Sequence, residues 1–274
     1  MILLHGWPYD IHSFVDVALL LAAAGYRVLN PYLRGYGPTR FISDATLRNG
    51  QPAALATGVI AFMDALGIQS AVIAGFDGGA RSANLVAALW PERCKAMVYV
   101  SGYLIGSQEA GPMPLPPQAE LEWWYQYYFA TERGRAGYER YRREFARLIW
   151  KLAASPKWAF DDATFDRSAV AFDNPDHVAI AIHNYRWRLS LAQGESRYDA
   201  YEVRLARFLS IAVPSIIMEA TPMARRILRP PPTPGNSRGA PRTASSRAAS
   251  DTTYRRKPLG NLRRRSSTWT NGTD

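Results

Sequence analysis

The sequence predicts an α/β protein with a doubly wound, mostly parallel sheet and an all-helical insertion. Short apolar segments alternate with helix-like segments through residues 1–106, which is typical of a parallel sheet covered on both faces. From residue 107 the composition changes to a Pro-rich linker and then to aromatic, helix-like sequence that runs to residue 207. An apolar segment over residues 208–219 then indicates a return to the sheet.

Strands and helices are predicted in alternation along residues 1–106. The segment "MILLHGWP" predicts a strand that ends at His5-Gly6. "VALLLAAAG" predicts a helix that ends at Gly25, and a strand follows over residues 27–31. "QPAALATGVIAFMDALGI" predicts a second helix, which ends at Gly67. The segments "SAVIAGFD", "ARSANLVAALWPERC" and "KAMVYVSG" predict a strand, a helix and a strand in turn.

The second half of the chain is predicted to be mainly helical before its pattern is lost. "GPMPLPPQ" forms the linker, and "ELEWWYQYYFATERGRAGYERYRREFARLIWKLA" and "NPDHVAIAIHNYRWRLSLA" predict helices. "FLSIAVPSIIME" predicts a buried strand. After Glu219 no apolar periodicity remains, and such a Pro-, Ser-, Thr- and Arg-rich segment cannot bury enough apolar surface to offset its conformational entropy. The predicted organisation is a core over 1–106, a helical cap over 107–207, a core strand over 208–219 and a non-native, disordered basic tail over 220–274.

Composition and charge restrict the classes of function. The net charge is +10, and residues 220–274 carry all of this excess, because they hold 12 of the 33 basic residues and 2 of the 23 acids. The body of the chain is therefore neutral, and we expect no nucleic-acid partner. One cysteine excludes a disulfide framework, and no apolar stretch is long enough to span a bilayer. These features predict a reducing, cytoplasmic setting without membrane association.

The stretch "AVIAGFDGGARSA" carries the strongest functional signal. A strand, Gly-x-Asp-x-Gly-Gly and a helix form the pattern of a nucleophile elbow, with Asp77 in the place of the usual serine. The turn needs small neighbours, which Gly75 and Gly79 provide, and the amide of Gly78 lies where it can stabilise negative charge. The alternative is an ordinary turn in which Asp77 caps the helix.

Other segments give the elbow a family context. His5-Gly6-Trp7-Pro8 resembles the oxyanion loop of α/β-hydrolases, and "PYLRGYG" resembles their D-x-R-G-x-G loop. Residues 1–219 thus resemble an α/β-hydrolase with a helical cap, in the epoxide hydrolase and haloalkane dehalogenase branch. The resemblance implies that a carboxylate attacks an sp³ carbon and that a His-activated water hydrolyses the ester. It implies a small apolar epoxide or halide as substrate, no cofactor and no metal.

The resemblance also assigns roles to residues of this chain. Asp77 would be the nucleophile, and the amides of Trp7 and Gly78 would form the oxyanion hole. "WWYQYYF" and "HNYRW" resemble the cap segments whose two tyrosines, here Tyr125 and Tyr185, protonate the opening epoxide. The alternative role for these tyrosines is aromatic packing. The expected supporting residues are His5, Gly6, Pro8, Gly75, Gly79 and Gln126.

Two departures from the family pattern qualify the prediction. Gly78 stands where dehalogenases and most epoxide hydrolases carry Trp, which argues against a dehalogenase. No histidine follows His183, so the family's catalytic base is absent, and we expect at most a single turnover. The expected sheet also lacks elements at both ends.

The missing base has a possible origin in the reading frame. When "ATPMARRIL" and "ASDTTYRRKPLGN" are back-translated and read with one extra leading base, they permit a Gly-Asp loop and a Gly-Ile-Gly-His loop. These resemble the family's acid and histidine loops, so we hypothesise a frameshift after Glu219. The competing interpretation is a genuine basic tail that binds nucleic acid or acidic membrane.

The function predicted from the sequence is hydrolysis of an epoxide to a diol through an alkyl-enzyme ester, impaired by the missing base. The alternatives are a haloalkane or haloacid dehalogenase and a non-catalytic paralogue that binds small apolar ligands. An esterase would need Ser at position 77. A homodimer is a further expectation.

Overall fold

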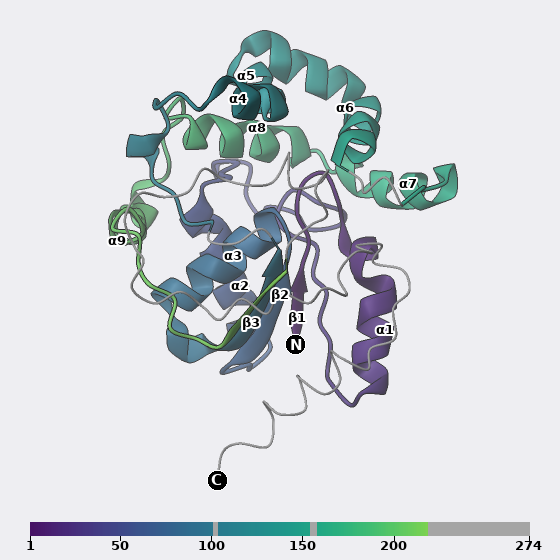
Figure 1. Ribbon diagram of the computed structural model, residues 1–274, viewed down its shortest axis with the longest axis vertical. Coiled ribbons are helices and arrows are strands. Elements are labelled where there is room, and N and C mark those ends of the chain that lie inside the picture. Colours follow the sequence, from purple (N-terminus) through teal and green to yellow (C-terminus); the bar gives the residue numbers. More distant parts are fainter. Residues whose placement is uncertain (101–103, 154–157, 219–274) are drawn as a thin grey trace.

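The computed structural model describes residues 1–100, 104–153 and 158–218 (Figure 1). In this part of the chain, one sheet contains the strands β1 (Ile2–Leu4), β2 (Ala71–Gly75), β3 (Cys94–Val100) and β4 (Ser215–Met218). The strands are all parallel and their order is β1-β2-β3-β4. The register pairs Leu4 with Gly75 and Gly75 with Tyr99, so β1 to β3 end close together at one edge of the sheet. This edge is where the predicted site begins.

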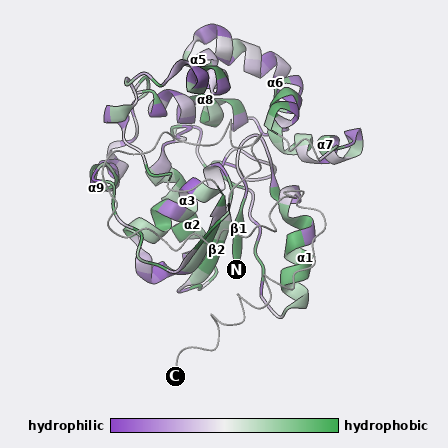
Figure 2. Cartoon of the chain, viewed as in Figure 1, coloured by the Kyte–Doolittle hydropathy of each residue, from purple (hydrophilic) through white to green (hydrophobic). Residues whose placement is uncertain are grey.

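Helices cover both faces of the sheet, as the alternating sequence predicts. The covering helices are α1 (Val15–Ala23), α2 (Pro52–Ala65) and α3 (Gly78–Leu89). Leu3 packs with Phe14 and Leu21 beside α1, whereas Ile2 and Leu4 pack in the large cluster that includes side chains of α2 and α3. Successive residues of β1 therefore face opposite layers, which makes the sheet doubly wound. Figure 2 shows apolar residues concentrated in α1 and in the strands.

Two strand predictions need correction. Residues 27–31 form no extended strand: Leu29 makes a single bridge to Ile2, with backbone hydrogen bonds to Leu3 and Met1. The segment cannot continue the ladder because Pro31 has no N–H, and the Asn30 side chain turns away to the carbonyl of Ile11. The last strand is also shorter than residues 208–219, since pairing with β3 is confined to Ser215–Met218. The predicted tail, 220–274, lies outside the described residues.

Six further α-helices follow β3 in the described part of the chain, and α4 to α8 lie beyond the carboxyl ends of the strands (Figure 1). They are α4 (Pro117–Glu122), α5 (Trp124–Ala130), α6 (Glu132–Ala153), α7 (Asp162–Ala169), α8 (His177–Arg188) and α9 (Asp199–Leu205). Single-turn helices occur at Ile11–Phe14, Pro91–Arg93, Gln108–Ala110, Val170–Asp173 and Ser196–Tyr198. A second, mainly aromatic cluster joins the α5, α6 and α8 side chains to Trp7. These helices therefore form the expected cap, and it packs on the loop after β1.

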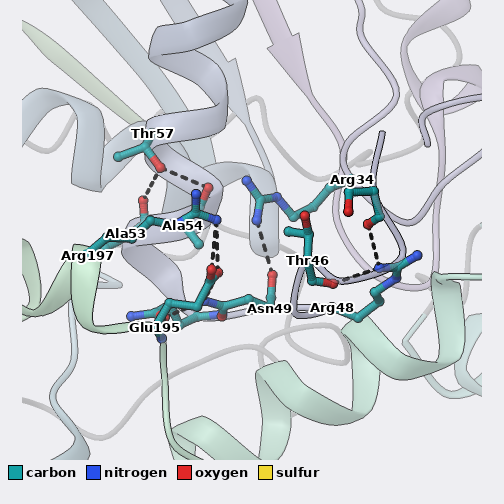
Figure 3. Close-up of polar contacts among 11 residues, drawn as sticks. Arg34, Thr46, Arg48, Asn49, Ala53, Ala54, Thr57, Glu195 and Arg197 are labelled. Atoms are coloured by element: carbon teal, nitrogen blue, oxygen red, sulfur yellow. Dashed lines mark hydrogen bonds and ion pairs between the residues drawn. The ribbon is translucent and has the colours of Figure 1, made fainter. Parts of the chain in front are cut away.

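Polar contacts join the end of the cap to the start of α2 (Figure 3). The Asn49 side chain donates to Glu195 Oε2 at 3.0 Å. Glu202 Oε1 accepts from the amide of Ala53 at 3.0 Å and from Gln51 Nε2 at 3.1 Å. The first amides of a helix lack partners within it. Glu202, in the last helix of the cap, α9, supplies such a partner at the N-terminus of α2. Burial raises the pKa of this carboxyl.

A helix must be both long and apolar to cross a bilayer. None of the helices within residues 1–218, the gaps at 101–103 and 154–157 excepted, combines the two properties.

Candidate active site

The predicted nucleophile lies in a sharp turn between β2 and α3. Asp77 has φ 50° and ψ −121°, a conformation that L-residues rarely adopt, and α3 starts at the next residue. Such strain is retained only where the surrounding structure enforces it, and it is typical of functional turns. The turn is enforced here by close packing, because a Cβ on Gly79 would lie 1.9 Å from the carbonyl oxygen of Leu4. The prediction that Gly75 and Gly79 serve close approach agrees with this geometry, since a Cβ on Gly75 would lie 2.6 Å from the Gly79 carbonyl carbon.

The loop after β1 lies directly against the Asp77 carboxylate. The backbone N–H of Trp7 donates to Asp77 Oδ1 at 2.9 Å. A Cβ on Gly6 would lie 2.4 Å from the Asp77 Cβ, so only glycine allows this approach. Gly78 is the first residue of α3, and the N–H groups of a first helical turn have no partner within the helix. The structure therefore brings together the three groups predicted to form the nucleophile and the oxyanion hole.

The two predicted cap tyrosines converge on the same place. Tyr125 of α5 and Tyr185 of α8 have ring centroids 5.5 Å apart, and each ring lies 5.4 Å from the Trp7 ring. Both are buried. Burial raises the pKa of both phenols, and the nearby Asp77 charge raises each further. They therefore hold their protons over the whole physiological range and can act as donors.

The remaining predicted supporting residues have mainly structural contacts. The His5 Nε2 accepts from the amide of Leu33 at 3.1 Å, and its Nδ1 faces the Gly6 carbonyl at 3.1 Å. Burial lowers the pKa of His5 to about 4, so it is a neutral ring that shapes the loop. The carbonyl of Pro8, which follows a cis peptide bond, accepts from the Trp150 indole at 2.7 Å. Gln126 is buried, and its Nε2 has no hydrogen-bond partner within the described residues.

Three residues near the site were missed by the sequence interpretation. The Trp7 indole Nε1 donates to the Tyr138 hydroxyl at 2.8 Å, and this hydroxyl lies 2.7 Å from His177 Nε2. Arg81 lies in the first turn of α3 and donates to the Leu104 carbonyl at 2.5 Å. Burial, together with Arg188, lowers the pKa of Arg81 to about 9, so it remains a cation at neutral pH. The position of Arg81, four residues after Asp77 in the first turn of the helix that follows, was the available signal for Arg81, whereas Tyr138 and His177 carried no local signal.

Each of the four histidines is engaged away from Asp77. His5 is buried, and both of its ring nitrogens make the contacts described above. His177 is also buried, and its ring nitrogens contact the Tyr138 hydroxyl and the Gly35 carbonyl. His12 pairs with Asp10 at 2.6 Å. His183 accepts from the Gly50 amide and contacts the Gln193 carbonyl. Among the described residues, no group of three or more His, Cys, Asp or Glu side chains could hold a metal ion.

Comparison with known proteins agrees with this geometry. Residues 1–176 match the alpha/beta hydrolase fold family, and the chain belongs to that family. Within it, the chain lies on the epoxide hydrolase branch. It is 59% identical to a Klebsiella pneumoniae protein whose crystal structure is titled that of a "putative epoxide hydrolase", with a TM-score of 0.81, over 85% of this chain and 76% of that one.

Two curated relatives are also named epoxide hydrolases, and the chain matches them over shorter segments. Epoxide hydrolase B of Mycobacterium tuberculosis is 33% identical over 148 residues, which cover 49% of this chain and 40% of the relative. An epoxide hydrolase of Caballeronia sordidicola is 37% identical over 97 residues, which cover 35% of this chain and 29% of the relative. The chain thus spans less than half the length of these two relatives.

Proposed function

We propose that this chain is an epoxide hydrolase-type enzyme in which Asp77 attacks an epoxide carbon. One observation carries the proposal: the Trp7 amide holds Asp77 Oδ1 at 2.9 Å, while the Trp7 ring packs against both Tyr125 and Tyr185. A carboxylate nucleophile and two phenol donors therefore meet around one residue. The similarity to epoxide hydrolases over parts of the chain supports the same activity.

The hydrogen bond to Oδ1 assigns different roles to the two carboxylate oxygens. Oδ2 attacks the epoxide carbon and forms a C–O bond, while the ring C–O bond breaks and leaves its electron pair on the epoxide oxygen. This alkoxide is a stronger base than a phenolate, so it takes a proton from Tyr125 or Tyr185 even though burial raises the pKa of both. Because the two rings lie 5.5 Å apart, the second phenol is close enough to stabilise the resulting phenolate.

The second half of the reaction requires a base, and no histidine within the described residues is free to act as one near Asp77. Water attacks the ester carbonyl, and the oxyanion forms on Oδ1, where the amides of Trp7 and Gly78 stabilise it. The water must lose a proton, and the four histidines are all engaged elsewhere. We therefore propose that the ester at Asp77 is hydrolysed slowly and accumulates. The DNA sequence across codon 220 tests whether a histidine loop lies in another frame.

The same geometry weighs against halide as the leaving group. In the dehalogenase pattern an indole N–H holds the halide, but the Trp7 indole N–H is donated to Tyr138 at 2.8 Å. Gly78 offers no indole beside the nucleophile. Phenol donors, by contrast, suit an alkoxide that needs a proton.

Incubation with styrene oxide followed by intact mass spectrometry tests the proposal. We expect the protein to gain the mass of one substrate molecule on the peptide that contains Asp77, with less than one diol released per chain during labelling. Asp77→Asn is the matched control and should gain no mass. Steady diol release would refute the proposal that the base is missing. An adduct that survives Asp77→Asn would refute the proposal that Asp77 is the nucleophile. Halide release from haloalkanes without any epoxide adduct would favour the dehalogenase.

A further inference from the structure

A chain of buried hydrogen bonds holds the Trp7 indole from the side away from its backbone. An indole can only donate, so Trp7 Nε1 gives its hydrogen to the Tyr138 hydroxyl at 2.8 Å. The Tyr138 hydroxyl must then give its own hydrogen to His177 Nε2, which lies at 2.7 Å. His177 therefore carries its hydrogen on Nδ1 and donates it to the Gly35 carbonyl at 2.9 Å. Each of these three hydrogen bonds therefore has a fixed direction, from Trp7 to Tyr138, from Tyr138 to His177 and from His177 to Gly35.

The residues of this hydrogen-bond network are buried and come from separate parts of the fold. Tyr138 is 0% exposed and His177 is 1% exposed, and they belong to α6 and α8. Gly35 lies in the core loop that precedes α2, and a Cβ there would lie 2.8 Å from the side chain of Ile180. Because no solvent can replace a lost partner, removal of the Tyr138 hydroxyl leaves two buried polar groups unsatisfied.

Trp7 links this hydrogen-bond network to the proposed catalytic groups. Its amide holds Asp77 Oδ1, and its ring lies 5.4 Å from the Tyr125 ring and 5.4 Å from the Tyr185 ring. A displacement of the indole would therefore change the packing of the phenols, and it would redirect the amide to the extent that the Trp7 backbone moves with the ring. Displacements of about 1 Å in such groups can cost up to about a hundredfold in rate.

We infer that Tyr138 and His177 are positioning residues that fix Trp7, and through its amide the carboxylate of Asp77, for attack on the substrate. The inference rests on the proposed function for its effect on rate. Neither residue needs to touch the substrate. Their action is to select one orientation of the indole among the five aromatic rings that contact it within the described residues.

The rate of ester formation in Tyr138→Phe tests this role. We expect the maximal rate of labelling of the full chain by styrene oxide to fall about tenfold or more, while the half-saturating concentration stays within about twofold. Tyr141→Phe is the matched control, because Tyr141 lies on the same helix and is 49% exposed, and it should label at the parent rate. His177→Gln retains a donor and an acceptor and should keep most of the rate, whereas His177→Leu should not. A Tyr138→Phe protein that folds and labels at the parent rate overturns the inference.

A second measurement decides the inference without any turnover. In protein labelled with ¹⁵N-tryptophan, Trp7→Phe identifies the indole and backbone signals of Trp7, and Asp77→Asn shows that the backbone signal reports on the carboxylate. We expect Tyr138→Phe, or His177→Leu if the first variant does not fold, to shift both signals. A shifted indole signal with an unchanged backbone signal overturns the inference. If the parent chain forms no ester, the proposed function fails, and the two signals still establish whether Tyr138 positions the amide.

Discussion

Replacing Gly79 by alanine should displace α3 from β1, whereas the same change at Gly78 should not. A Cβ on Gly79 would lie 1.9 Å from the Leu4 carbonyl oxygen and 2.6 Å from the His5 carbonyl oxygen. Ordinary contact begins near 3.4 Å, so the helix must retreat by about 1.5 Å from a backbone that cannot rotate away. A Cβ on Gly78 meets only the Gly6 Cα, at 3.9 Å. Overpacking against backbone costs at least about 3 kcal/mol, whereas the open position stays within about 1 kcal/mol of the parent.

Thermal unfolding followed by circular dichroism measures the difference between these variants. For a domain of this size 1 kcal/mol corresponds to roughly 2–4 °C, so Gly79→Ala should unfold about 6–12 °C below the parent. Gly78→Ala should unfold within about 4 °C of it. Failure of Gly79→Ala to accumulate as folded protein is the same outcome in a stronger form. Equal unfolding temperatures for the two variants would refute the close approach of α3 to β1, and with it the enforced turn at Asp77.

Three further predictions follow from the contacts described. Tyr125→Phe and Tyr185→Phe should each lower the rate of ester formation by about 10²-fold, and the double variant should lose it, in labelling experiments; parent rates would exclude these phenols as donors. Burial lowers the pKa of His177 from 6.5 to about 4, so the unfolded chain binds the proton first and stability should fall as the pH drops from about 6.5 to 4, by about 3 kcal/mol. Urea titrations should show a shallower acid dependence for His177→Gln, and an unchanged slope would contradict the assignment. Glu202→Ala should lower the free energy of unfolding by about 1–2 kcal/mol, because the N-terminus of α2 loses its acceptor. Glu202→Gln keeps a side-chain oxygen and should retain most of that stability; equal unfolding free energies for Glu202→Ala and the parent would contradict the role of Glu202.

The sequence predicted those parts of the site that depend on local constraints. The elbow was visible because the turn at Asp77 needs small residues at fixed short spacings, whereas the loop at Trp7 was located through its resemblance to the oxyanion loop of α/β-hydrolases. Tyr125 and Tyr185 were located only through the resemblance to a family. Their rings lie 5.5 Å apart in the structure, and their catalytic roles remain predictions.

The features that the sequence did not predict depend on distant contacts. Tyr138 meets Trp7 across 131 residues, and no periodic pattern encodes that pairing. The predicted strand over residues 27–31 was wrong because apolar character alone does not show whether a segment can complete a hydrogen-bonded ladder beside β1. The organisation after residue 218 and the frameshift hypothesis lie outside the described residues and remain predictions.

Hydrogen bonds join the cap to the core at several separated places, and this has a consequence for how a substrate enters. Trp7 and Gly35 of the core bond to Tyr138 and His177 of the cap at one place, and α2 is bonded to Glu202 at another. A cap held at separated points cannot open as one rigid body without breaking one of these sets of bonds. We therefore expect access to depend on local rearrangement of single helices or loops. Variants that loosen one fastening should then change the rate of substrate entry separately from the rate of chemistry.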